Sequence, residues 1–319
     1  MFNRTGRVPV IAALMIGIGL ILAPAIFQMF SRAPLGGTMI EDFEPYMVEA
    51  KIDTFRGYMD QIGVAVEQAA DVRTSMIESG TVSMAEFDSQ YVSVQQLTSG
   101  WAAINADMTD LLDRMNANMD DYAAVAALPP FPMFPWFFVL PGLLVAGVAS
   151  SILRSMHKNR PHRQRLWVLA GLGVAITAAP VAFQMFTRAP MGRDMIDSFR
   201  PMMTRERVQN VQGYFVTLGG GEGQMRVTLI PAYVAAGGDV ADHPAIAEFS
   251  AQWPTIVKDF NPMIATMSDN VDNFQAVDAL PSFALFPWFF LVPGVLVAGL
   301  AGVALRRQSS PPSHLEAAS

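Results

Sequence analysis

The chain has 319 residues, of which 52% are hydrophobic and only 15% are charged, and its formal net charge is −7. This composition is typical of a membrane protein, and the negative charge argues against nucleic-acid binding. The chain contains no cysteine, so disulfides cannot stabilise a domain on an oxidising side of a membrane.

Much of the sequence occurs twice. Phe27–Pro34 returns with one change as Phe183–Pro190, an offset of 156 residues (27 to 183), and Ala127–Phe138 returns as Ala279–Phe290, an offset of 152 (127 to 279). We therefore predict a tandem repeat. The predicted parts are repeat 1 at residues 1–155, a basic link at 156–165, repeat 2 at 166–307 and a disordered cytoplasmic tail at 308–319.

Four stretches lack ionisable side chains, and each has about 20 residues, the length at which a helix crosses the hydrocarbon layer. They are residues 8–30, 131–153, 166–186 and 283–305. Basic residues precede the first stretch, fill the link and follow the fourth, which predicts that these three segments are cytoplasmic. We expect a multi-pass protein of the cell membrane, surrounded by lipids, with both termini in the cytoplasm and an uncleaved first span.

The long segments at residues 31–130 and 187–282 then lie outside the cytoplasm. The first carries sixteen Asp and Glu against five Lys and Arg. Apolar residues recur at three- and four-residue steps in two stretches of each segment, which predicts paired amphipathic helices. The predicted fold is all-α, with four transmembrane helices and two extracytoplasmic helical-hairpin domains in a parallel tandem repeat.

The junctions between the spans and the outer segments are the most similar parts of the two copies. Arg-Ala-Pro at residues 32–34 and 188–190 is the predicted break, because proline disfavours helical geometry in the residue before it. Phe-Pro-Trp-Phe-Phe on the return predicts an aromatic belt at the lipid headgroups. The predicted membrane-interface anchors are Arg32, Trp136, Arg188 and Trp288.

Small residues predict close packing inside two spans. Gly142 with Ala146, and Gly294 with Ala298, have the four-residue spacing that lets helix backbones approach. The other glycine-rich segments, at residues 218–223 and 235–239, do not fit a dinucleotide fingerprint and are expected to be loops.

Residues suited to catalysis are scarce. His243 is the only histidine of an outer segment, which leaves no good triad or histidine zinc site. Ser155 and Lys158 match a Ser-x-x-Lys pattern, but they lie at the cytoplasmic link without companion motifs. Three aspartates between residues 107 and 113 could attract calcium, although a solvated helix face is the preferred interpretation. We predict no catalytic residue, metal or cofactor.

Methionine pairs four residues apart occur on the outer helices of both copies. Thioethers can bind copper(I), but these positions continue an apolar stripe, which favours a helical core. A Met-rich groove that accepts a lipid or a partner helix is intermediate between the two. The candidate ligand or partner surface comprises Trp101, Met115, Met119, Trp253, Met263 and Met267.

The leading hypothesis is a non-enzymatic envelope protein, scaffold or sensor-like, whose paired acidic outer domains bind a partner protein, a second copy or an apolar ligand. A transporter or lipid-export component is the alternative, because duplicated halves are common in transporters, and a membrane enzyme comes third. None of the four spans contains a charged residue. The main polar side chains of the spans, Gln28 and Gln184, lie near the ends of the first and third spans. We expect specificity where the copies differ, at residues 68–96 and 217–248.

The run Ala127–Phe138 and its copy, each after a Trp-led helix and an Arg-Ala-Pro start, resemble a group of uncharacterised actinobacterial integral membrane proteins. The resemblance covers both repeats and implies a membrane location, with no established activity. The order of span, helical hairpin and span also resembles the sensing part of chemoreceptors. The longest internal cytoplasmic loop is the short basic link, which argues against a signalling region there.

Overall fold

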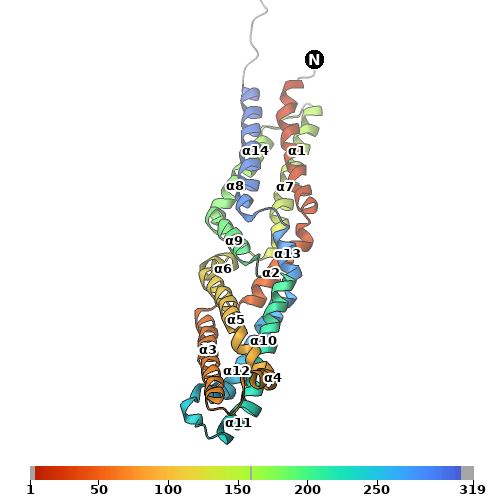
Figure 1. Ribbon diagram of the computed structural model, residues 1–319. Helices are drawn as coiled ribbons and strands as arrows, with labels where there is room; N and C mark the ends of the chain where they lie inside the picture. The colour runs from red at the N-terminus through yellow and green to blue at the C-terminus, as the bar shows by residue number, and fades with distance from the viewer. Residues whose placement is uncertain (1–3, 159, 310–319) are drawn as a thin grey trace, which may run out of the picture. The chain divides into compact units, whose positions relative to one another are not determined.

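The computed structural model describes residues 4–158 and 160–309, which contain helices and no strand (Figure 1). The chain divides into two units, which are described separately. The apolar unit comprises Met1–Thr38, Asp121–Ile196 and Asn273–Ser319, and the bundle comprises Met39–Asp120 and Asp197–Asp272. The disordered tail was predicted to begin at residue 308, but residues 308 and 309 belong to α14, and the rest of the predicted tail lies outside the described residues.

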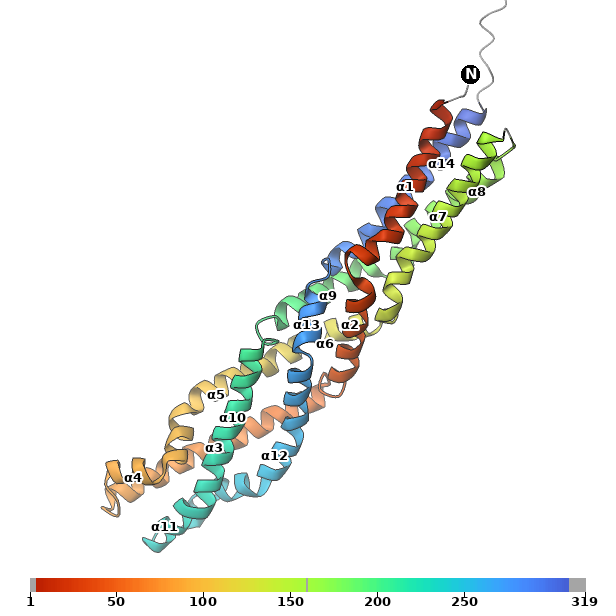
Figure 2. The ribbon, with the colours of Figure 1, turned by 90° about the vertical axis from the view of Figure 1, so that its right-hand side faces the viewer.

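Four described helices of the apolar unit are long and apolar enough to cross a membrane. They are α1 (Arg4–Ile26), α7 (Phe134–His157), α8 (Arg163–Ala182) and α14 (Phe286–Ser309), which run beside one another in Figure 2. Large apolar side chains remain exposed along each of them, among them Ile11, Leu144, Val174 and Leu296. Such a surface suits contact with lipid rather than water.

Glycines bring these helices together in two close pairs. A Cβ atom on Gly17 of α1 would lie 2.9 Å from the carbonyl oxygen of Gly142 on α7. In the second copy, a Cβ atom on Gly173 of α8 would lie 2.8 Å from the carbonyl oxygen of Gly294 on α14. The predicted close packing is confirmed, because only a hydrogen side chain permits these backbone distances.

Aromatic residues at matched positions of the two copies meet within the apolar unit. The ring centroids of Phe134 and Phe286 are 5.9 Å apart, and those of Phe138 and Phe290 are 4.6 Å apart. Two short 3-10 turns, Phe131–Met133 and Phe283–Leu285, precede these helices. Residues at matched positions of the sequence thus contact each other in this unit.

The break after each first span differs from the prediction. Helix α1 ends at Ile26 and α2 covers Met29–Phe43; in the second copy α8 ends at Ala182 and α9 covers Met185–Phe199. Pro34 and Pro190 therefore lie inside helices, and the predicted Arg-Ala-Pro break is wrong. Gln28 and Gln184 interrupt the helices instead, with left-handed φ angles of 54° and 52°. Each proline removes one backbone hydrogen bond in the second helical turn, which does not end the helix.

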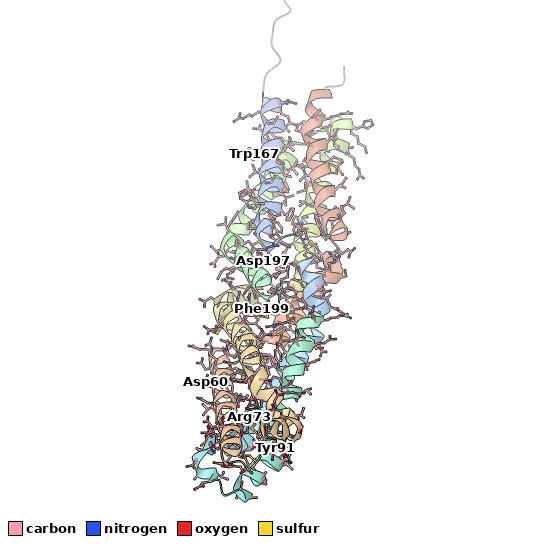
Figure 3. The ribbon with its side chains drawn as sticks, viewed as in Figure 1. Asp60, Arg73, Tyr91, Trp167, Asp197 and Phe199 are labelled. Carbon is pink, nitrogen blue, oxygen red and sulfur yellow. The ribbon has the colours of Figure 1, made fainter. Side chains whose placement is uncertain are left out.

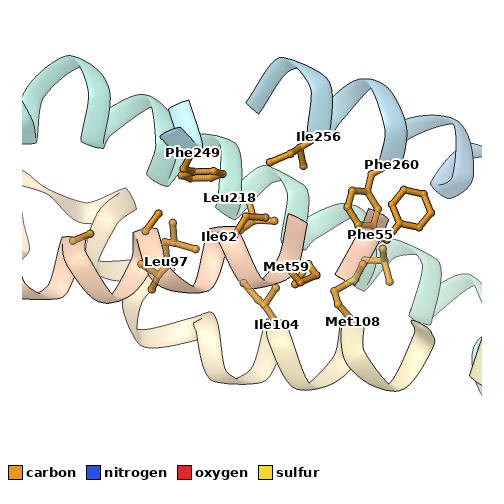
Figure 4. Close-up of a cluster of buried hydrophobic side chains, with 14 of the residues drawn as sticks. Phe55, Met59, Ile62, Leu97, Ile104, Met108, Leu218, Phe249, Ile256 and Phe260 are labelled. Atoms are coloured by element: carbon orange, nitrogen blue, oxygen red, sulfur yellow. The ribbon is translucent and has the colours of Figure 1, made fainter. Parts of the chain in front are cut away.

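The bundle contains four long helices from both copies. They are α3 (Glu49–Glu78), α5 (Val92–Ala117), α10 (Arg205–Gln224) and α12 (Pro244–Asp269). Helices α3 and α10 each pack against both α5 and α12, and their apolar faces share one core (Figure 4). The two expected hairpins thus form a single unit, because an isolated pair of amphipathic helices would leave much of its apolar stripe in water.

Short elements complete the described residues. Helix α4 (Met84–Gln90) precedes α5, and the π-helical turn Met225–Leu229, α11 (Ile230–Ala235) and the 3-10 turn Val240–Asp242 lie between α10 and α12. Helices α6 (Met119–Ala126) and α13 (Val271–Asp278) follow α5 and α12. The breaks are at Asn118 and Asn270, whose Nδ2 atoms donate to the carbonyl oxygens of Arg114 and Thr266.

The glycine-rich segment at residues 218–223 is helical, which corrects the predicted loop. It forms the end of α10, where Gly221 packs on Leu97 and a Cβ atom on Gly219 would lie 3.1 Å from the indole of Trp253. The glycines thus serve close packing against α5 and α12 rather than a turn. Residues 235–239 do include a turn, with Gly237 at a φ of 92°.

Candidate functional site

A groove of about 470 Å³ lies between α10 and α12 on the outside of the bundle. The rings of Phe215 and Trp253 stack in it at 6.4 Å, and Val216 at its edge is 76% exposed. We call this the α10/α12 groove. Its lining comprises Gln212, Phe215, Val216, Trp253, Val257, Asn261, Ile264 and Ala265.

Helical spacing explains why these side chains converge. On α12 the lining residues begin at Trp253 and recur about every four residues. On α10 they fall within about one helical turn. The lining residues of each helix therefore lie on one face of that helix. Gly219 leaves room for the indole of Trp253 against α10. No lining residue is ionisable, so the groove is an apolar surface with two amides, Gln212 and Asn261.

The matched side of the first copy has the opposite character. We call it the α3/α5 face, and three of its residues, Arg56, Asp60 and Asp113, occupy the positions of Gln212, Val216 and Ala265. Nη2 of Arg56 on α3 lies 2.8 Å from Oδ1 of Asp113 on α5. Asp60 is exposed on the outer side of α3 (Figure 3). An ion pair therefore bridges the two helices where the second copy has a groove.

Two matched aspartates connect the copies inside the bundle. Asp259 accepts hydrogen bonds from Nζ of Lys51 at 3.0 Å and from Oη of Tyr58 at 3.1 Å. Asp107 is held in the same way by Arg207 and Tyr214, the counterparts of Lys51 and Tyr58. These two clusters link α3 to α12 and α5 to α10.

Burial, hydrogen bonds and neighbouring charges together shift the pKa values of these two aspartates. Burial would raise the pKa of Asp107, but the hydrogen bonds from Arg207 and Tyr214 and the charge of Arg207 together lower it. The hydrogen bond from Lys51 lowers the pKa of Asp259, against the effect of burial. Burial and the bonded carboxylate raise the pKa of Tyr58 and of Tyr214. Each aspartate thus accepts two hydrogen bonds from the other copy with its ionised form favoured, which suits a structural link better than general-base catalysis.

Two matched glutamines cap helices of the opposite copy. Oε1 of Gln224 accepts from the backbone amides of Ser93 and Val94 at 2.8 and 3.0 Å, at the start of α5. Oε1 of Gln68 accepts from the amide of Ala245 at 2.8 Å, at the start of α12. The prediction missed these residues, although their offset of 156 (68 to 224) would have identified them as a retained pair.

The predicted ligand surface is mostly core. Met115, Met263 and Met267 are only 4%, 1% and 3% exposed, which corrects the surface prediction and supports the helical-core interpretation. Met119 and Trp101 are half-buried at the edge of this core. Trp253 is the one residue of the predicted surface that lines the α10/α12 groove.

The predicted interface anchors make matched contacts in the apolar unit. Trp136 packs edge-on against Phe30 at 5.7 Å, and Trp288 packs edge-on against Phe186 at 5.9 Å. The Nη1 atoms of Arg32 and Arg188 donate to the carbonyl oxygens of Ala279 and Ala127 at 3.0 and 3.1 Å. Each arginine therefore binds just beyond a short helix of the other copy, which the sequence did not predict.

The residues considered for catalysis are engaged or isolated. The described part of the chain contains no group of three or more His, Asp and Glu that could hold a metal. Ser155 donates to the carbonyl oxygen of Ser151 and accepts a hydrogen bond from Arg165. His243 is buried, with its ring edge-on to Tyr233 at 5.4 Å, and its Nδ1 makes no hydrogen bond with any residue that the structure describes.

No protein-family model matches the chain, and a search of curated proteins finds no match either. The resemblance to actinobacterial membrane proteins therefore stays a prediction, and the α10/α12 groove is the strongest candidate site on geometry alone.

Proposed function

We propose that this chain is a multi-pass membrane protein whose bundle lies outside the cytoplasm and binds a neutral, largely apolar small molecule in the α10/α12 groove. The observation that carries this proposal is the contrast between the open, uncharged groove and the ion-paired face at the matched positions. The role is binding, as in a sensor or carrier, rather than catalysis.

The membrane placement is supported by the apolar unit. Its four candidate spans expose large apolar side chains that water would solvate poorly. In sequence, each of these helices has one end toward a bundle segment and one end away from it. Basic residues, including Arg154, Arg163 and Arg306, cluster at the ends that lie away from the bundle segments. By the positive-inside rule those ends are cytoplasmic, so the bundle is outside.

The chemistry of the groove selects the class of ligand. A charged ligand would lose hydration there without an opposite charge to compensate, because no lining residue is ionisable. Phe215 and Trp253 offer flat apolar surfaces, while Gln212 and Asn261 offer neutral donors and acceptors. The volume of about 470 Å³ falls in the range of small-molecule sites. A hydrocarbon body with one hydrogen-bonding end fits these features.

A substitution taken from the other copy tests this function. Val216→Asp introduces the residue that the first copy has at Asp60, and it replaces an apolar side chain at the edge of the groove with a hydrated carboxylate. Val64→Asp, at an exposed position on α3, is the matched control. The protein is purified in mild detergent, and retained neutral molecules are identified by organic extraction and mass spectrometry.

We expect the wild-type chain and the Val64→Asp variant to retain a neutral lipophilic molecule, and the Val216→Asp variant to lose it. Binding of Nile red, a neutral apolar dye, to the same three proteins gives a second readout. Equal retention and equal dye binding by both variants would rule out the α10/α12 groove as the site.

A further inference from the structure

A second groove, of about 210 Å³, lies in the apolar unit between α7 and α8. Phe137 and Phe183 lie at the end nearer α9, with ring centroids 5.8 Å apart, and Ala175 and Ala179 form part of the α8 wall. All of its lining side chains are apolar, and Phe290 of α14 contributes to it. The groove lies along two helices that are each long and apolar enough to cross a membrane.

We propose that this groove seats an acyl chain of a bilayer phospholipid, from the leaflet on the side of α9. An apolar groove left empty forfeits dispersion contacts, and inside a bilayer the hydrocarbon tail is the molecule that reaches it. A second transmembrane helix does not fit, because a helix with side chains is about 10–12 Å across. The concave wall contacts a chain on several sides, which a convex helix surface cannot do.

The position of Arg188 favours a phospholipid over an uncharged lipid. Met185 lines the groove at the first residue of α9, and Arg188 follows three residues later, on the same side of that helix. Nη1 of Arg188 binds the carbonyl oxygen of Ala127, which leaves other guanidinium donors for a phosphate. A chain in the groove and a phosphate beside Arg188 would hold the lipid at two points.

This inference rests on the membrane insertion proposed above and is independent of the α10/α12 groove. Resistance of the chain to extraction from membranes by alkaline carbonate tests insertion separately. A chain released by carbonate would contradict the proposed membrane placement itself, whereas an inserted chain lacking the bound lipid would contradict only the acyl-chain site.

Adjacent alanines provide a matched pair of variants. Ala179→Phe fills the groove, while Ala178→Phe adds the same ring one position away, on an exposed side chain outside the lining. Each protein is reconstituted into vesicles of phosphatidylcholine and phosphatidylglycerol, extracted in mild detergent and examined by native mass spectrometry. We expect the wild type and Ala178→Phe to retain a phospholipid that Ala179→Phe loses. Arg188→Gln should lose it more readily on washing than the wild type does.

A photoactivatable group on the acyl chain of the same phospholipids keeps the test independent of how the variants fold. In wild-type vesicles, we expect the label to concentrate on Ala175 and Ala179 rather than on the neighbouring exposed Val174 and Ala178. Labelling spread evenly over these four positions, or equal lipid retention by two well-folded alanine variants, would overturn the proposal. Loss of the phospholipid on washing to the same extent from Arg188→Gln and from the wild type would overturn the role of Arg188.

Discussion

The α3/α5 face and the α10/α12 groove occupy matched positions of one bundle, and of the eight residues that line the groove only Trp253 has the same residue type at its matched position. On the α3/α5 face, Arg56 and Asp113 form an ion pair between the two helices. In the α10/α12 groove, the matched residues Gln212 and Ala265 line an opening together with Trp253. Trp101 and Trp253 are matched, half-buried, and next to the matched glycines 63 and 219. The tryptophan and its neighbouring glycine are thus kept on both sides, while the exposed residues around them differ.

This difference shows where a duplicated bundle can diverge without losing its fold. Arg56 and Asp113 are 36% and 61% exposed, and such surface pairs contribute only about 0–1 kcal/mol. Their replacement costs little stability, whereas the buried contacts between the copies cannot be replaced so easily. The exposed residues of one copy can therefore change to form a binding surface while the other copy keeps its ion pair.

Removing a core ring shared by both sides should have the largest effect. Phe260 of α12 stacks on Phe55 of α3 at 4.3 Å, and both are fully buried. We expect Phe260→Ala to lower the free energy of unfolding by about 3–5 kcal/mol. Denaturant titrations that follow Trp101 and Trp253 separately should show one coincident transition. If Trp253 lost its native signal while Trp101 kept it, the hairpins would be separate domains.

Transferring the ion pair to the second copy should close the groove. Gln212→Arg with Ala265→Asp reproduces Arg56 and Asp113 at the matched positions, and we expect it to weaken Nile red binding by more than about tenfold, or about 1.4 kcal/mol. The reciprocal change, Arg56→Gln with Asp113→Ala, is the control and should leave binding in the second copy unchanged. Undiminished binding after the transfer would show that the dye binds elsewhere.

Acid should weaken both sides of the bundle, because Asp107 and Asp259 are equivalent links. The folded-state pKa values of Asp107 and Asp259 are lowered. Their contribution to the free energy of unfolding is therefore present above the unfolded-state pKa of about 3.9, and it is lost as the pH falls through the lowered folded-state pKa values. We expect Asp107→Asn and Asp259→Asn each to cost about 1–2 kcal/mol at neutral pH and to flatten the acid limb of stability. Asp60→Asn, on an exposed side chain, should do neither. Urea unfolding followed from neutral pH to well below that unfolded pKa measures this directly.

The helical class, the candidate spans and the glycine packing at Gly142 and Gly294 were predictable, because apolar length and small-residue spacing are local signals. The left-handed break at Gln28 was not, since proline in the nearby Arg-Ala-Pro was the stronger sequence signal. The joining of the hairpins depends on contacts such as Asp107 with Arg207, which are 100 residues apart. The sequence predicted that Trp253 belongs to a ligand or partner surface, but it did not predict the groove, because the groove depends on which side chains surround Trp253.

The central claim is that the two matched tryptophans lie on functionally different faces. Two proteins test it most directly, both with Trp136, Trp167 and Trp288 changed to Phe: one also carries Trp101→Phe and keeps Trp253, and the other carries Trp253→Phe and keeps Trp101. Each is titrated with a neutral brominated alkane, which quenches indole fluorescence on contact. We predict saturable quenching of Trp253 and only weak, non-saturating quenching of Trp101. Equal quenching curves for the two proteins would contradict the account.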